Sequence, residues 1–182
     1  KQIYKCFSCG ASGNIFTLQT NTSNIGAKIS KYLPSGTPQY SVTIDAADQT
    51  FNHHILELVN GNIAVIYSKG SPNYELRFAV FHPSTLDVIK ASTIISTNSI
   101  NSSHTFSAVQ LSAGGFAVMY HDGASTLLSK LATFDNSGNA VLAPTTVWTR
   151  TGTNGAQYHK IAQLSNGNIV FAASSVNAVS GF

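Results

Sequence analysis

The sequence predicts an all-β protein built from internal repeats, and three observations favour this class. A phrase made of an apolar run, a glycine turn and a second apolar run recurs along the chain. Clusters of Gly, Asn, Ser and Pro separate the short apolar runs. No stretch has the periodicity of an amphipathic helix. The glycines of the recurring phrase are Gly13, Gly61, Gly114 and Gly167, spaced 48, 53 and 53 residues apart.

Each copy of this phrase predicts a β-hairpin. Two copies carry Asn-Gly between their apolar runs, at Asn60-Gly61 and Asn166-Gly167. This pair favours a type I′ turn, in which both central residues have positive φ. We therefore expect type I′ hairpins at these two places, with both glycines at positive φ.

Two further strands complete each repeat. An apolar strand ending in a second tight turn follows each hairpin, and a β-rich run follows that turn. The second turns lie at 32–36, 81–85 and 134–138, and the β-rich runs at 40–44, 88–95 and 141–148. Four short antiparallel strands in about 40–50 residues are typical of the blade of a β-propeller.

The expected architecture is therefore a partial β-propeller of about three four-stranded blades plus a fragment. We expect one β-repeat domain over residues 1–182, with repeats at 1–50, 51–103 and 104–158 and an incomplete one at 159–182. A lone blade cannot bury its faces until neighbouring blades cover them, and closed propellers have about four to eight. The chain is thus expected to be a fragment of a longer protein. A β-sandwich or another stacked β array is the alternative.

The composition narrows the function classes. Charged residues make up 9% of the chain, against about a quarter in an average soluble domain. The ten basic residues are scattered along the chain rather than gathered into a stripe, so nucleic-acid binding is not expected. No apolar run reaches the length of about 18 residues that indicates a membrane span, so no membrane insertion is expected. Loops rich in Ser, Thr and Asn favour a virion or extracellular location.

Two segments resemble a known type of repeat. Leu164–Asn168 (Leu-Ser-Asn-Gly-Asn) and Phe134–Asn139 (Phe-Asp-Asn-Ser-Gly-Asn) are similar to the degenerate propeller repeats of bacterial surface proteins and bacteriophage tail proteins. The resemblance implies a non-catalytic binding or structural module of a virion, as a phage tail fibre or tail component, or of a secreted surface protein. The implied partners are a host surface polysaccharide or neighbouring subunits, with a homo-oligomer as one form of assembly.

The rival function is a propeller-type hydrolase or lyase that acts on glycans. Glycoside hydrolysis commonly uses two carboxylates that flank the sugar, and different blades could supply them. Several acidic residues fall instead in predicted turns, namely Asp87, Asp122 and Asp135, where Asp stabilises the turn by local hydrogen bonds. No catalytic sequence motif is present. The sequence therefore predicts a protein that is not an enzyme.

Three histidines and two tyrosines are candidate binding residues. His54, His104 and His159 precede a turn glycine by seven, ten and eight residues. A ring of imidazoles near the propeller axis could bind a metal or an anionic ligand, although the unequal offsets favour turn-capping roles. Tyr67 and Tyr120 end equivalent second strands, and tyrosine suits contacts with sugars because it combines a flat apolar face with a polar tip.

The segment Tyr4–Asn14, which contains Cys6 and Cys9, resembles the second knuckle of the zinc ribbon in DnaG-type primases. The resemblance implies that both cysteines bind zinc and offers a third function, a zinc-binding nucleic-acid protein. A structural zinc needs four ligands, and no matching pair precedes these two. We therefore expect no structural zinc and no cofactor, and either a disulfide or two free thiols in a first strand.

Overall fold

The computed structural model describes residues 3–9, 13–20, 25–70, 74–97, 106–122, 128–149 and 156–175. These ranges hold thirteen strands. In chain order they are β1 (Ile3–Cys9), β2 (Ile15–Thr20), β3 (Ile25–Tyr32), β4 (Pro38–Glu57), β5 (Ile63–Lys69), β6 (Glu75–Phe81), β7 (Val88–Ser96), β8 (Ser107–Gln110), β9 (Phe116–Asp122), β10 (Leu128–Phe134), β11 (Ala140–Thr149), β12 (Ala156–Gln163) and β13 (Ile169–Ser175). The described ranges contain no helix, and so none that is long and apolar enough to cross a membrane.

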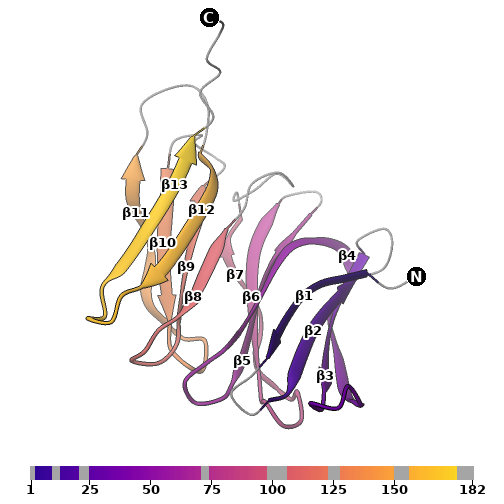
Figure 1. The fold of residues 1–182 in the computed structure, drawn as a ribbon. Coiled ribbons are helices and arrows are strands. Elements are labelled where there is room, and N and C mark those ends of the chain that lie inside the picture. The colour runs from indigo at the N-terminus through magenta and orange to yellow at the C-terminus, as the bar shows by residue number, and fades with distance from the viewer. Residues whose placement is uncertain are drawn as a thin grey trace, which may run out of the picture.

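The strands form antiparallel sheets in which neighbours in space are neighbours in sequence. One sheet has seven strands in the order β1 to β7, the second has β8 to β11, and the third has β12 and β13. The seven-stranded sheet contains two blades, because β4 pairs with β3 over 38–49 and with β5 over 50–57. We call β1–β3 with 38–49 blade 1, 50–57 with β5–β7 blade 2, β8–β11 blade 3 and β12–β13 blade 4. Figure 1 shows these four units fanned side by side, which confirms the predicted partial propeller.

The first hairpin turns of blades 2, 3 and 4 have the same hydrogen bonds. The Leu58 N–H donates to the Asn62 carbonyl over 2.8 Å, and the Gly61 N–H donates to the Leu58 carbonyl over 2.8 Å. The same two bonds recur with Leu111, Gly114 and Gly115 in blade 3, and with Leu164, Gly167 and Asn168 in blade 4. The three turn glycines have φ values of 87°, 103° and 87°. The first hairpin turns of these three repeats are therefore structurally equivalent.

The predicted type I′ turn is wrong in one respect. It requires positive φ at Asn60 and Asn166, but Asn52 and Leu86 are the only non-glycine residues with positive φ in the described ranges. The hydrogen bonds are those of a type I turn followed by a left-handed glycine in a G1 bulge. The asparagines act through their side chains instead: Asn60 Oδ1 accepts a 3.1 Å bond from the Asn62 N–H.

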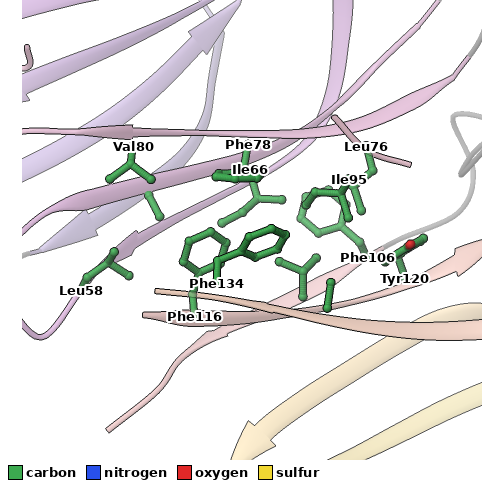
Figure 2. Packing of buried hydrophobic residues seen from close by; sticks show 13 residues of the cluster. Leu58, Ile66, Leu76, Phe78, Val80, Ile95, Phe106, Phe116, Tyr120 and Phe134 are labelled. Atoms are coloured by element: carbon green, nitrogen blue, oxygen red, sulfur yellow. The ribbon is translucent and has the colours of Figure 1, made fainter. Parts of the chain in front are cut away.

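The hydrophobic core lies between adjacent blades. Along β5, Ile63, Val65 and Tyr67 pack toward blade 1, whereas Ala64 and Ile66 pack toward blade 3. A strand covered on both faces reads as a continuous apolar run rather than an alternating one. Figure 2 shows the cluster between blades 2 and 3, which centres on three phenylalanine rings. Their centroids are 4.5 to 5.4 Å apart, and the rings are Phe78, Phe116 and Phe134.

The inner strands of successive blades meet near one axis. The ring of His54 on β4 lies 5.0 Å from the ring of Phe106 just before β8, and the Ile161 N–H on β12 donates a 3.3 Å bond to Ser107 Oγ on β8. The outer strand β11 is instead largely exposed. The tight turns 58–62, 111–115 and 164–168 share one rim. The opposite rim, which we call the far rim, is where β8 and β12 begin and β9 ends.

Candidate functional site

Ionisable side chains gather at the far rim where blade 4 meets blade 3. Strand β9 ends with His121 and Asp122, and the antiparallel partner β10 begins there, so that Ser129 lies opposite His121 and Leu128 opposite Asp122. Strand β12 brings His159 to the same end of blade 3. Three strands from two blades therefore bring polar residues to this rim, the two histidines and Ser129 on the face of blade 3 toward blade 4 and Asp122 on the other face.

The buried part of this cluster links the two blades. His159 Nε2 and Ser129 Oγ are 3.0 Å apart, and both residues are 1% exposed. The ring of His121, also buried, stacks on the ring of His159 with a centroid distance of 6.4 Å and an interplanar angle of 22°. Where blades 2 and 3 are joined by phenylalanine rings, blades 3 and 4 are joined at this rim by imidazoles and a hydroxyl.

A partly buried ion pair lies at the same rim on the other face of blade 3. Asp122 and Lys130 form a salt bridge across β9 and β10, with side chains 14% and 25% exposed. Asp122 directly follows the buried His121 along the strand. The sequence placed Asp122 in a turn, but the structure places it at the end of β9. The chain continues the hydrogen-bonded ladder to this residue, so its carboxylate pairs with a lysine on the neighbouring strand instead of capping a turn.

His54 lies nearer the axis and is held neutral. Burial lowers the pKa of His54 below its ordinary value, and the charge of Lys160 lowers it further. His54 stands on β4 and Lys160 on β12.

The candidate histidines do not share one position in the repeat. Counted back from the turn glycine, His54 corresponds to Ser107 and Lys160, whereas His159 corresponds to His53 and Phe106. Neighbouring residues of a strand face opposite sides of the sheet, so His54 packs on Phe106 of the following blade and His159 on Ser129 of the preceding one. His104 lies outside the described residues. Within those residues no group of three or more His, Cys, Asp or Glu side chains could hold a metal ion.

Tyr67 and Tyr120 occupy equivalent positions in the core. Both are buried, with the Tyr67 hydroxyl 2.6 Å from Ser92 Oγ and the Tyr120 side chain hydrogen-bonded to Ser96. Burial raises the pKa of both phenols above the ordinary value. The structure thus gives these two tyrosines a packing role between blades.

For the two cysteines the structure describes the backbone position only. Cys6 and Cys9 lie on β1 and pair with Leu18 and Ile15 of β2. Their side chains lie outside the part of the chain that the structure describes.

Most other described carboxylates have local partners. Asp45 pairs with Lys69 at 3.5 Å, and Glu75 with Arg77 at 2.6 Å. Asp135 caps its turn as predicted: desolvation would raise its pKa, but hydrogen bonds from residues of its own turn outweigh this effect and lower it. Asp122 is paired as well, with Lys130, and differs from these carboxylates in lying at the far rim, one residue from the buried His121.

Comparison with known proteins gives a structural likeness alone. No protein-family model matches the chain, and no curated protein matches it in sequence. The K499G mutant of NanB sialidase from Streptococcus pneumoniae matches with a TM-score of 0.61 and 16% identity, over 96% of this chain and 28% of that chain. An endo-arabinase from Bacteroides thetaiotaomicron has a TM-score of 0.49 and 13% identity, over 88% of this chain and 65% of its own. An alpha-L-arabinofuranosidase from Lactobacillus brevis has a TM-score of 0.48 and 11% identity, over 96% of this chain and 66% of that chain.

These findings correct the function expected from the sequence. The likeness to the sialidase supports the propeller fold, and this chain spans 28% of that enzyme's length. The expectation of a non-catalytic module that is not an enzyme is contradicted by this likeness, because the protein that shares the fold is a sialidase. No family or sequence match supports the phage-tail resemblance.

Proposed function

We propose that this chain forms part of the propeller of a glycan-cleaving hydrolase. The observation that carries the proposal is the Asp122–Lys130 ion pair, which lies at the far rim on the face of blade 3 that packs on blade 2. The structural likeness to a sialidase adds support from the fold. Fold alone does not determine chemistry, so the proposal rests on the site.

In the proposed reaction, water cleaves the glycosidic bond. Asp122 accepts a proton from the attacking water, and an acid from another part of the protein protonates the departing sugar oxygen. Lys130 orients the carboxylate through the ion pair. Ser129 and His159 act only through the strand, because their hydrogen bond fixes the start of β10 against β12 from the face opposite Lys130. Tyr67 and Tyr120 are poor nucleophiles, since both phenols are buried and their pKa values are raised.

The proposed substrate is an extracellular polysaccharide, which also places the protein outside the cell. The composition supports this setting, because only 9% of residues are charged and neutral hydroxyl and amide groups take their place. Such groups pair with sugar hydroxyls at a smaller desolvation cost than charges do.

A substrate panel tests the proposal. The purified protein is incubated with sialosides, arabinan and arabinofuranosides, together with neutral and acidic polysaccharides, and released reducing sugar is measured. We expect cleavage of at least one glycan. If none is shortened at protein concentrations where the fold is intact by circular dichroism, the hydrolase assignment fails.

A further inference from the structure

Each blade presents one face to the blade that precedes it, and in blades 2 and 3 this face is apolar. Equivalent positions follow from the turn glycines and from the strand registers. In blade 2 the residues are Ile63, Val65 and Tyr67 on β5 and Ala79 and Phe81 on β6. In blade 3 they are Phe116, Val118 and Tyr120 on β9 and Ala132 and Phe134 on β10. All ten are buried against the preceding blade.

The same face of blade 1 is polar. Counted from Gly13, the β2 positions are Ile15, Thr17 and Gln19, and their partners on β3 are Tyr32, Ser30 and Lys28. Thr17 thus takes the place of a valine, Gln19 that of a tyrosine and Ser30 that of an alanine. The alternate residues Phe16, Leu18 and Ile29 pack toward blade 2, so the polar set faces away from it.

The polar groups of this face form a built arrangement. Gln19 is 3% exposed, and its Nε2 donates to Thr17 Oγ1 over 3.2 Å and to the Tyr32 hydroxyl over 3.1 Å. Beside it is a hollow of about 180 Å³, whose lining includes Gln19, Lys28, Ser30, Tyr32, Gln39 and Ser41. Covering these groups with an apolar blade would leave some without partners, at a cost of about 1–3 kcal/mol for each. The face is therefore unsuited to the kind of contact that joins blades 1, 2 and 3.

We propose that this hollow binds one sugar unit of a glycan, as a secondary site away from the far rim. Hydroxyl and amide groups both donate and accept, as sugar hydroxyls do, so the polar part of the lining suits a polyhydroxylated ligand. Five of the six lining residues named are neutral, and Lys28 supplies three further donors. The choice of a glycan rests in part on the proposed function, since a second site would hold a polymeric substrate near the propeller.

Isothermal titration with soluble oligosaccharides tests this site, using neutral and carboxylate-bearing members of the substrate panel as probes. Ser41 is exposed on β4, and Ser41→Phe fills the hollow without altering the core. We expect the wild type to bind and Ser41→Phe to weaken binding at least tenfold, with Gln39→Trp as a second blocking variant. Thr145→Phe, at an exposed position of the outer strand β11, is the matched control and should bind like the wild type.

Binding and cleavage fail separately in this design. Binding without cleavage removes the hydrolase assignment and leaves the secondary site intact. The absence of binding to every probe at millimolar concentration overturns the secondary site, as does equal binding by the wild type and both blocking variants. Lys28→Met distinguishes the ligand type: a loss confined to carboxylate-bearing probes identifies an acidic sugar, and an equal loss for all probes identifies a neutral one.

Discussion

His159 and Ser129 join blades 3 and 4 through a hydrogen bond of 3.0 Å between Nε2 and Oγ, with both residues 1% exposed. The bond holds the first strand of blade 4 against the start of β10, whose opposite face carries Lys130 and its ion pair with Asp122. A buried polar link has a defined geometry, because a misaligned pair loses its hydrogen bond. This contact therefore fixes, from the other face of the sheet, the strand on which Lys130 stands.

Removing the hydroxyl of Ser129 should destabilise the protein. In Ser129→Ala the hydrogen bond to His159 is lost inside the core, which we expect to lower the free energy of unfolding by about 1–3 kcal/mol. Urea unfolding followed by circular dichroism measures the change. Ser137→Ala, in the exposed turn before β11, is the control and should be close to neutral. Equal midpoints for the two variants would show that the bond contributes nothing.

The turn glycine of blade 4 is required for its backbone conformation. Gly167 has a φ of 87°, and a Cβ added there would meet no atom within 4 Å. Gly167→Val should therefore lower stability by about 1 kcal/mol or more through strain alone. Gly167→Asn should cost less, because asparagine tolerates the left-handed region. Thermal denaturation of both variants checks this, and a valine variant as stable as the asparagine variant would refute the conformational assignment.

Gly115 should be more sensitive still, for a steric reason. A Cβ there would lie 1.9 Å from the carbonyl oxygen of Phe134, which belongs to the neighbouring strand. Gly115→Ala should thus separate β9 from β10 and cost more than Gly167→Ala. Parallel thermal denaturation of the two alanine variants compares them, and the reverse order of stability would contradict the structure.

The aromatic cluster between blades 2 and 3 should dominate stability. Phe116 is fully buried, whereas Phe171 on β13 is 42% exposed. Phe116→Ala is expected to cost about 3–5 kcal/mol, as large truncations in cores do. Phe171→Ala removes the same atoms from a half-exposed site and should cost far less. Chemical denaturation measures both, and similar losses would mean that the interblade core is misplaced.

Protonation of His54 should weaken the fold in mild acid. Its pKa is lowered in the folded state by burial and by Lys160, so the unfolded chain binds the proton more readily. The stability from neutral His54 is present above its unfolded pKa of about 6.5 and is lost as the pH falls through the folded pKa. His54→Phe should reduce the difference in unfolding free energy between pH 7.5 and pH 5. The control is His82→Gln, at an exposed turn, which should show the wild-type difference in unfolding free energy between the two pH values. If His54→Phe also shows the wild-type difference, this account is refuted.

The architecture could be predicted from the sequence, because each blade repeats its turn chemistry locally. The turn glycines were recognised from their immediate sequence neighbours alone, and they are Gly61, Gly114 and Gly167. The predicted turn type was wrong because Asn60 does not adopt positive φ and instead accepts a hydrogen bond through its side chain. The candidate site could not be read in the same way. Ser129 and His159 are thirty residues apart and meet only when blade 4 packs on blade 3. One signal was present: His121 and Asp122 directly follow the buried run 116–120 at a strand end.

The activity of Asp122→Asn on a cleaved glycan tests the central claim most directly. The substitution keeps the shape of the side chain and removes the carboxylate, so kcat should fall by about 10²–10⁴-fold while the fold and KM change little. Asp87→Asn, in the exposed turn of blade 2, is the matched control and should keep wild-type activity. Full activity in Asp122→Asn would contradict the placement of the catalytic carboxylate at the far rim of blades 3 and 4.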